Sequence, residues 1–321
     1  MTMQYRFLSD SGLLVSVFGF GCLVQSDDQE AIDGAYELMA RAFKRGVNFF
    51  DTVEAYGNGG SELVLGRVVA RGVHDGTRED LVISTKLFFG TRPGPNARGI
   101  SHKHIVEGMK ASLKRLGMDY VDVVFCHRSE KNTPMEEVVR AMNFVIEQGW
   151  ALYWGTSNWH EIDLLEANAV ADRLGLIRPV AEQPEYNLFQ RSQVEVDFQP
   201  LYMTRRFGLT TWSPLLFGLL TGKYASGIPE GSRLTSEFYR SLLKDLPQRV
   251  EQVEKLRPIA EELGCSLAQL ALAWAAANTD VSTVLLGATN AKQLDENLQA
   301  LEFVEKITPK LCARMDQIIP M

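Results

Sequence analysis

The chain has 321 residues, of which 45% are apolar and 23% are charged, a composition typical of a globular protein rather than a disordered one. Its 33 basic and 40 acidic residues give a net charge of −7 without a basic block, so neither a nucleic acid nor an anionic membrane is expected as a partner. The polar start lacks the apolar core of a secretory signal, and no stretch reaches the ~18 apolar residues of a membrane span. We therefore expect a cytoplasmic protein without membrane insertion.

The chain contains four cysteines, which are scattered without CxxC or paired spacing: Cys22, Cys126, Cys265 and Cys312. This distribution argues against a zinc site and against the disulfide framework of a secreted protein. His102 and His104 form an HxH pair, but cysteines or carboxylates on a helix face do not accompany them. We expect a solvated helix start at this pair and no metal site.

Residues 1–16 are typical of a hairpin that turns at Ser9–Gly12, and short apolar runs alternate with amphipathic helical segments after it. This alternation is the pattern of βα units and a parallel sheet. The apolar runs predict eight strands, at Val17–Gly19, Val47–Phe50, Leu81–Thr85, Val121–Cys126, Leu152–Thr156, Val180–Gln183, Leu209–Thr211 and Val284–Leu286.

The helical segments carry recognisable start signals. Thr133, Pro134 and Glu136 read as a capping box with proline at the first helical position, and Gly149 stands where the following amphipathic helix should end. Similar starts occur at residues 266–269 and 290–293. These signals predict helices between the strands.

Eight parallel strands with intervening helices fit best into a closed (β/α)₈ barrel of the TIM type, because closure removes both sheet edges. A doubly wound open sheet is the structural alternative. We expect one barrel domain over residues 1–321, with an N-terminal hairpin. A long Gly- and Pro-rich stretch after Pro214 follows the seventh strand and is long enough to be functional.

In such a barrel the chemistry lies at the carboxyl ends of the strands, where three runs are followed by an ionisable residue: Asp51, Lys86 and His127. Alone, these residues could equally form a structural ion-pair network. Tyr56 lies five positions after Asp51, in a loop whose glycines would let the backbone bring a phenol over the barrel mouth. We interpret the four residues as one catalytic group.

The free phenol has a pKa of ~10, and a nearby cation lowers it by stabilising the phenolate. Lys86 would supply that cation, and Asp51 would pair with Lys86 and hold it in position. His127 could hydrogen-bond a substrate carbonyl and share in proton delivery. With Tyr56 as the acid, the group would suit reduction of a carbonyl.

The segment 46–52 with Tyr56, the sequence Ser-Thr-Lys that ends at Lys86, and His127 together resemble the catalytic tetrad of aldo-keto reductases. The resemblance implies a TIM barrel that binds NADP(H) and reduces a small-molecule aldehyde or ketone. In that family the tyrosine protonates the carbonyl oxygen while the nicotinamide delivers hydride.

The expected nucleotide site is not a Rossmann site, because Gly19-Phe20-Gly21 lacks the third glycine of that motif. By resemblance, Ser157, Asn158 and Gln183 hold the nicotinamide amide, and Trp212 stacks on the nicotinamide ring. The resemblance assigns further cofactor contacts to Ser213, Pro214, Leu215, Gly218, Lys223, Arg233, Gly287, Thr289, Gln293, Glu296 and Asn297.

Two of these segments would bind phosphate. Gly287-Ala288-Thr289 precedes a predicted helix start, which is a natural anion site for the adenosine 2′-phosphate and favours NADPH over NADH. Lys223 and Arg233 supply cations that would lie over the pyrophosphate and the 2′-phosphate.

Residues 212–233 and 293–298 are similar, more closely, to the beta subunits of voltage-gated potassium channels. That branch implies tightly held NADP, weak reductase activity and a tetramer associated with a channel. The chain departs from it at Leu23, Asn158 and His127, where the branch carries tryptophan, arginine and, in mammals, asparagine. Each departure favours an ordinary reductase.

Two functions therefore stay open: an NADPH-dependent carbonyl reductase, and an NADP-bound regulatory subunit that senses redox state for a channel partner. A cofactor-free barrel hydrolase is a third. Phe88 and Phe89 suggest an apolar rim to the substrate pocket. The substrate itself, and the choice between a monomer and a homo-tetramer, stay open as well.

Overall fold

The computed structural model describes residues 2–24, 26–73, 77–205 and 207–321. Eight parallel strands close into a barrel in the order β10-β3-β4-β5-β6-β7-β8-β9. The strands are β3 (Phe18–Gly21), β4 (Phe49–Asp51), β5 (Val82–Leu87), β6 (Val121–Cys126), β7 (Ala151–Thr156), β8 (Ala181–Glu182), β9 (Gly208–Thr211) and β10 (Val281–Leu286). The predicted barrel is confirmed, and the open-sheet alternative is wrong.

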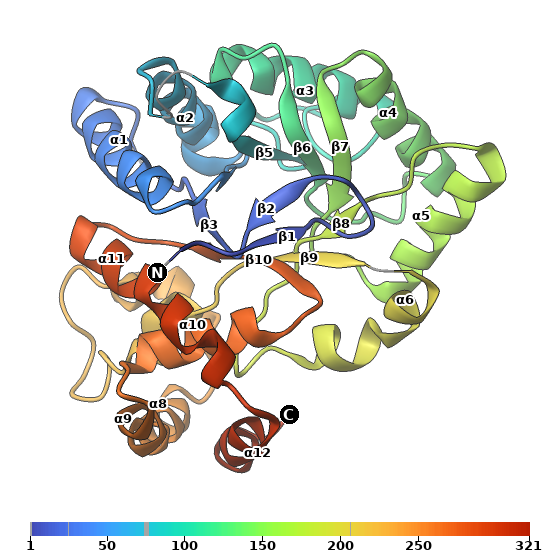
Figure 1. The fold of residues 1–321 in the computed structure, drawn as a ribbon. Coiled ribbons are helices and arrows are strands. Elements are labelled where there is room, and N and C mark those ends of the chain that lie inside the picture. Colours follow the sequence, from blue (N-terminus) through green and yellow to red (C-terminus); the bar gives the residue numbers. More distant parts are fainter. Residues whose placement is uncertain (1, 25, 74–76, 206) are drawn as a thin grey trace.

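Helices surround the strands as an outer layer (Figure 1). They are α1 (Gln29–Lys44), α2 (Gly60–Ala70), α3 (His102–Leu116), α4 (Met135–Glu147), α5 (Glu161–Leu174), α6 (Gln199–Thr204), α7 (Glu237–Ser241), α8 (Leu246–Lys255), α9 (Arg257–Leu263), α10 (Leu267–Ala277), α11 (Ala291–Gln299) and α12 (Pro309–Ile318). Among the described residues, none of these helices is long and apolar enough to cross a membrane.

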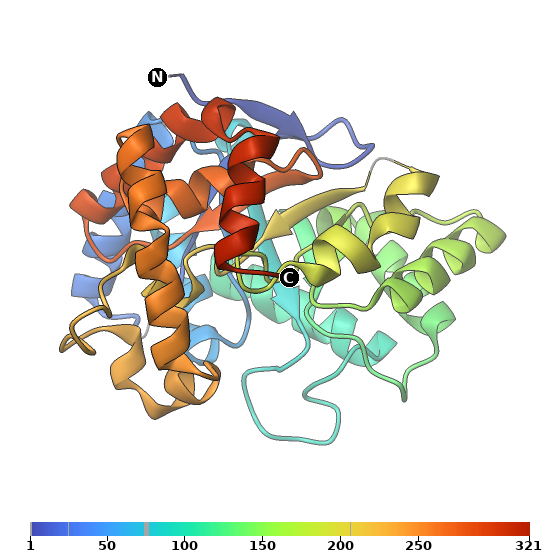
Figure 2. The same ribbon diagram turned by 90° about the horizontal axis from the view of Figure 1, so that it is seen from below.

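The predicted N-terminal hairpin is present as two antiparallel strands, β1 (Tyr5–Phe7) and β2 (Leu14–Ser16). The guanidinium of Arg6 donates hydrogen bonds to the carbonyls of Asn278 (3.1 Å) and Val281 (2.6 Å), at the start of β10. The hairpin therefore lies at the amino ends of the barrel strands. Figure 2 shows it at the end opposite the long loop that follows β5.

Two of the three predicted helix starts are capped as expected, by Ser266 and by Asn290, and the third is not. Ser266 and Gln269 form the expected capping box at the start of α10. At α4, however, Pro134 itself occupies the cap position, in an extended conformation and without a side-chain cap. The hydroxyl of Thr133 donates instead to the carboxylate of Glu130, which draws it away from the helix amides.

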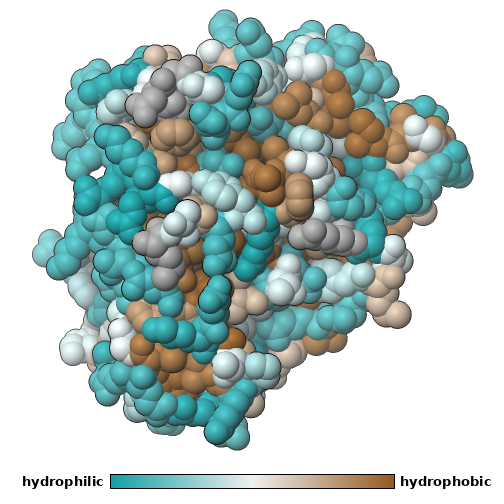
Figure 3. All heavy atoms as spheres, in the orientation of Figure 1, coloured by the Kyte–Doolittle hydropathy of each residue, from teal (hydrophilic) through white to brown (hydrophobic). Residues whose placement is uncertain are grey.

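The core has two apolar layers. The inner layer fills the barrel and includes two residues of the hairpin segment, Leu8 and Val15. Its barrel residues are Phe49, Val82, Val123, Phe125, Val180, Ala181 and Leu285. The outer layer lies between the strands and the helices. On the face shown in Figure 3 the rim is mostly hydrophilic, and hydrophobic residues gather in patches inside it.

Candidate active site

Strand alternation explains why the ionisable residues meet inside the barrel. Successive side chains of a strand point to opposite faces, so every second residue shares a face. Phe49 and Phe125 belong to the inner apolar layer, and Asp51 and His127 follow them by two positions. Lys86 stands in the same way two positions beyond Ser84, which contacts Asp51. The barrel interior is therefore apolar at the hairpin end and ionisable at the carboxyl end.

Asp51 and Lys86 form a buried ion pair with a distance of 2.5 Å between Oδ2 and Nζ, and their side chains are only 7% and 3% exposed. The hydroxyl of Ser84 donates to Asp51 Oδ1 at 2.6 Å, and the amide of Gln183 donates to the same oxygen at 3.3 Å. Lys86 also donates to the carbonyl of Thr52 at 3.0 Å. Burial lowers the pKa of Lys86, and Asp51 opposes that shift. The expected contact between the two residues is present.

Tyr56 is partly buried at the start of a short 3₁₀ turn that follows β4. Burial, followed by the charge of Asp51, raises its pKa to about 12, while Arg233 and Arg128 act in the opposite direction. The expectation that Lys86 lowers the pKa of Tyr56 is therefore wrong for this structure. The ammonium of Lys86 is engaged by Asp51, whose carboxylate itself disfavours the phenolate.

Glu54 fixes the loop that carries Tyr56. This carboxylate is 1% exposed and accepts hydrogen bonds from the backbone amides of Phe88 (2.7 Å) and Gly90 (2.8 Å). His104 Nε2 lies 3.4 Å from the same oxygen. His102, at the start of α3, is exposed as expected, whereas His104 is buried and departs from the expectation of a solvated pair. Within the described residues no group of His, Cys, Asp and Glu side chains could hold a metal.

His127 and Arg128 form one wall of the site. The imidazole meets the ring of Phe89 edge to face at 5.0 Å, and its buried Nδ1 has no hydrogen-bond partner among the described residues. Burial, helped by the charges of Lys86 and Arg128, lowers the pKa of His127 to about 2. The imidazole is therefore neutral, which suits it to orient a carbonyl rather than to supply a proton as imidazolium.

Arg128 is absent from the sequence-based prediction. Its guanidinium donates to the carbonyl of His127 at 2.7 Å and lies over the ring of Phe89, 5.7 Å from the centroid. Its charge acts on the pKa of Tyr56. The available signal was its position, directly after an ionisable residue at the end of a strand.

The residues predicted to hold the nicotinamide amide are brought together. Ser157 donates through Oγ to the carbonyl of Gln183 at 2.9 Å, and the amide of Asn158 donates to Ser157 Oγ at 2.7 Å. The indole of Trp212 donates to Asn158 Oδ1 at 3.2 Å. Asn158 has φ of 56°, a left-handed conformation that turns the chain sharply after β7. These side chains form one connected network at the ends of β7, β8 and β9.

Glu182, which sequence reasoning missed, lies under this network and is fully buried. It accepts hydrogen bonds from the hydroxyl of Thr156 at 2.5 Å and from the amide of Trp159 at 3.2 Å. Burial nevertheless raises its pKa to about 8. An acid held neutral at this point can donate as well as accept a hydrogen bond.

Ser213, Pro214 and Leu215 continue from Trp212 into the segment after β9. Ser213 has φ of 57°, and its carbonyl accepts a hydrogen bond from the amide of Asn187 at 3.1 Å. This contact fixes a left-handed turn immediately after the indole. The turn directs the chain across the carboxyl end of the barrel toward Gly218.

Two cations from that segment lie against glycines. A Cβ placed on Gly218 would lie 2.7 Å from Nζ of Lys223, and one placed on Gly287 would lie 3.6 Å from a guanidinium nitrogen of Arg233. Burial, and then the charge of Arg233, lower the pKa of Lys223. Neither cation forms an ion pair within the part of the chain that the structure describes. The two exposed cations are thus close enough for their charges to interact, and neither is paired with a carboxylate in the described ranges.

Thr289 and Gln293 meet at the start of α11, where the amide and hydroxyl of Thr289 both donate to Gln293 Oε1 at 3.0 Å. The amide of Asn297 donates to the carbonyl of Gly287 at 3.4 Å. Gln293 thus bonds back to Thr289 instead of completing a capping box with Asn290.

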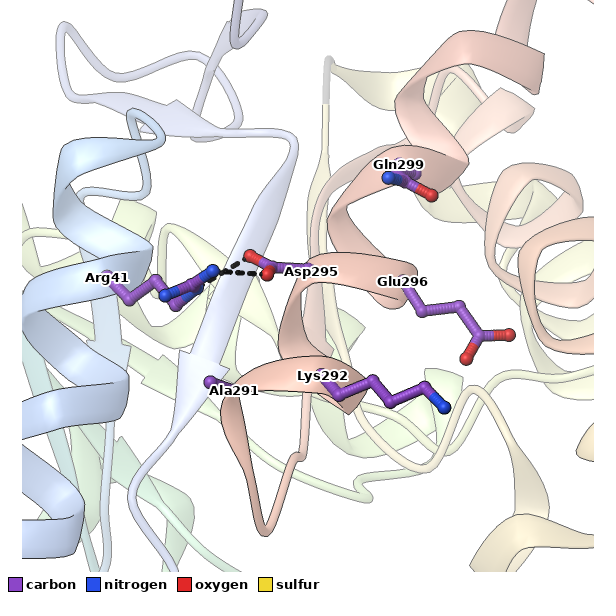
Figure 4. Close-up of a pocket in the computed structure, with 6 residues that line it drawn as sticks. All are labelled: Arg41, Ala291, Lys292, Asp295, Glu296 and Gln299. Carbon is purple, nitrogen blue, oxygen red and sulfur yellow. Dashed lines mark hydrogen bonds and ion pairs between the residues drawn. The ribbon is translucent and has the colours of Figure 1, made fainter.

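Glu296 lies apart from these residues. It lines a surface hollow of about 490 Å³ between α1 and α11, which it shares with Arg41, Ala291, Lys292, Asp295 and Gln299 (Figure 4). Arg41 and Asp295 form an exposed ion pair there, and in Figure 4 the side chain of Glu296 extends away from that pair. None of the tetrad residues lines this hollow.

The chain is similar to known proteins along almost its whole length. The sequence model of the aldo/keto reductase family matches residues 17–320. A relative from Arabidopsis thaliana named "Probable voltage-gated potassium channel subunit beta" is 50% identical over 99% of this chain and 97% of its own length. A rice relative (Oryza sativa subsp. japonica) of the same name is also 50% identical, with the same coverage. A Schizosaccharomyces pombe relative, "Putative voltage-gated potassium channel subunit beta", is 45% identical over 99% of this chain and 93% of its own length.

Proposed function

Because the chain belongs to the aldo/keto reductase family, we propose that it reduces aldehydes or ketones with NADPH and that Tyr56 donates the proton. Membership of the family implies an NAD(P)-dependent oxidoreductase. The observation that carries the finer proposal is the buried ion pair of Asp51 and Lys86 at the barrel mouth, with Tyr56 and His127 beside it. We also propose that residues 1–321 form one domain, since the hairpin packs onto the barrel.

The residues of the cofactor segment fit a phosphate-bearing nucleotide. Lys223 and Arg233 are close enough for their charges to interact, yet no carboxylate among the described residues neutralises them. Both side chains are exposed and can reach an anion from solution, and NADP carries three phosphate groups. We propose that these cations hold its phosphates, that Ser157, Asn158 and Gln183 hold its carboxamide, and that Trp212 packs against its ring.

The remaining contacts proposed for the cofactor are Ser213, Pro214, Leu215, Gly218, Gly287, Thr289, Gln293, Glu296 and Asn297. Gly287 and Thr289 offer backbone amides and a hydroxyl before α11, as the helix start in an anion site does. When bound, NADPH supplies the hydride for the carbonyl carbon. This chemistry needs a proton for the carbonyl oxygen, which the chain itself must deliver.

The proposed proton donor is fully protonated at neutral pH, because the pKa of Tyr56 is about 12. Arg128 and Arg233 favour the phenolate that remains after the proton has moved to the carbonyl oxygen. His127, as a neutral imidazole, hydrogen-bonds the same oxygen and orients it. Lys86 and Asp51 form the polar floor of the site, and Tyr56 regains its proton from solvent after the product leaves.

The test is NADPH oxidation in the presence of a panel of aldehydes, ketones and quinones, followed at 340 nm. We expect Tyr56→Phe to abolish turnover while NADPH still quenches tryptophan fluorescence, and Lys86→Met to slow turnover strongly. Tyr239→Phe is the matched control, since this phenol also acts on the pKa of Tyr56 but has no proposed role. Unchanged turnover in Tyr56→Phe would refute the assignment.

A second candidate function is a regulatory subunit that uses bound NADP to report redox state to a potassium channel. It is favoured by the 50% identity, over 99% of this chain, to proteins named as potassium channel beta subunits. A homo-tetramer that copurifies with a channel from the same cell would support it. Brisk turnover by a monomer that retains no membrane partner would count against it.

A further inference from the structure

Arg128 forms no ion pair with a carboxylate among the described residues, although it is only partly exposed. Arg249 has a similar exposure and also forms none there, but it lies over the ring of Phe189. Six other arginines of intermediate or low exposure form ion pairs: Arg78 with Asp122, Arg115 with Glu62, Arg178 with Asp172, Arg191 with Asp316, Arg205 with Asp10, and Arg314 with Glu262. Arg128 has no carboxylate within 4.0 Å in the described part of the chain. One of its five N–H donors is used, by the carbonyl of His127.

An unpaired guanidinium in this position costs free energy. Burial lowers the pKa of Arg128, which shows that water is partly removed from the charge. The acid whose charge acts on it is Glu182, but the pKa of that acid is about 8, so the carboxyl is mostly protonated at neutral pH. Glu182 therefore does not supply the missing counter-charge.

The surroundings hold the guanidinium beside the carbonyl-binding groups. The ring of Phe89 packs against both Arg128 and His127, so the three side chains form one wall. Nδ1 of His127 has no hydrogen-bond partner in the described part of the chain, and Tyr56 is close enough for its charge to act on Arg128. Arg128 thus lies beside Tyr56 and His127, the two residues proposed to bind the carbonyl.

We propose that Arg128 binds an anionic group of the substrate, so that the protein selects short aldehydes or ketones that carry a carboxylate or phosphate near the carbonyl. This inference rests on the proposed function, because the carbonyl is placed by Tyr56 and His127. The planar fork of a guanidinium matches either anion with two parallel hydrogen bonds. The phosphates of the cofactor have their own cations in Lys223 and Arg233, on a separate segment.

The experiment compares kcat/KM for matched substrates: succinic semialdehyde against butanal, and glyceraldehyde 3-phosphate against glyceraldehyde. We expect the wild type to favour at least one anionic member by about 10-fold or more, and Arg128→Met to reduce that ratio about 10- to 100-fold. Arg128→Lys, which keeps the charge but loses the fork, should give an intermediate ratio. Arg98→Met, an exposed arginine of the loop after β5, should leave the ratio unchanged.

The two pairs also separate carboxylate from phosphate as the preferred anion. Equal rates for neutral and anionic substrates in the wild type, or an equal loss for both in Arg128→Met and Arg128→Lys, would overturn the proposal. If no substrate turns over, the proposed function fails, and calorimetric titration of the NADP⁺-loaded protein with succinate or inorganic phosphate then decides. Binding that Arg128→Met removes upholds an anion site, and no binding to the wild type overturns it.

Discussion

Replacing Asp51 by asparagine should destabilise the protein more than almost any other single exchange of one polar residue for another. The ammonium of Lys86 is 3% exposed and lies 2.5 Å from Asp51, so the exchange leaves a buried cation with only the carbonyl of Thr52. Removing one partner of a buried ion pair costs about 3–5 kcal/mol, because the remaining charge is uncompensated. We therefore expect Asp51→Asn to lose about 3–5 kcal/mol of unfolding free energy.

The double variant Asp51→Asn with Lys86→Met distinguishes this explanation from a simple loss of contacts. With both charges gone, neither group is buried unpaired, and replacing a whole buried pair is often close to neutral. The double variant should therefore lose less unfolding free energy than the two single variants lose together, by about 2 kcal/mol or more. Both variants lose activity, so stability is the informative measurement.

The assay is equilibrium unfolding in urea, followed in parallel by circular dichroism and tryptophan fluorescence. The control is Asp295→Asn, which breaks the ion pair with Arg41, where side-chain exposures are 27% and 47%. Its two hydrogen bonds are as short as those of the buried pair, yet exposed pairs contribute only about 0–1 kcal/mol. A loss below 1 kcal/mol in Asp51→Asn, or strictly additive losses in the double variant, would refute the reasoning.

Three further predictions follow from single positions. The pKa of Glu182 is about 8 in the folded state and 4.5 in the unfolded state, so between these pH values the folded state holds a proton that the unfolded chain releases. The free energy of unfolding should therefore fall as pH rises from about 5 to 8. Glu182→Gln should flatten that slope in urea unfolding measured across this pH range. Gly218→Ala should displace Lys223 and weaken NADPH binding, on the order of 10-fold by fluorescence titration, whereas Gly227→Ala, whose Cβ meets nothing within 4 Å, should not. His104→Ala should cost about 1–3 kcal/mol of unfolding free energy by leaving a buried carboxylate with one donor fewer, and an equal effect of exposed His102→Ala would contradict this.

The sequence was informative about the site wherever strand alternation decides the outcome. An ionisable residue two positions beyond a buried apolar residue on the same strand must share its face, and this rule alone brings Asp51 and His127 into the barrel. The alternation rule does not depend on exact strand ends. It therefore holds even though β8 has only two residues where four were predicted. Gln183, just beyond it, still reaches Asp51.

The parts that could not be predicted depend on distances between remote segments. Glu54 and His104 are 50 positions apart, and their contact is set by how α3 packs against the loop after β4. The sign of the pKa shift of Tyr56 could not be predicted for the same reason, because it depends on whether the phenol lies nearer to Asp51 or to Lys86. Spacing along the chain contains no information on either balance.

The charge at the barrel mouth is opposite in sign to the net charge of the chain. The net charge is −7, yet around the barrel mouth Lys86 is neutralised by Asp51, while Arg128, Lys223 and Arg233 have no carboxylate partner in the described ranges. Beyond a Debye length of roughly 8–10 Å such charges are screened, so an acidic exterior does not prevent a cationic site from binding anions. The anionic cofactor and the proposed anionic substrate would then be recognised by separate cations, from the end of β6 and from the segment after β9. A change in substrate preference could therefore arise at Arg128 without any change in cofactor affinity.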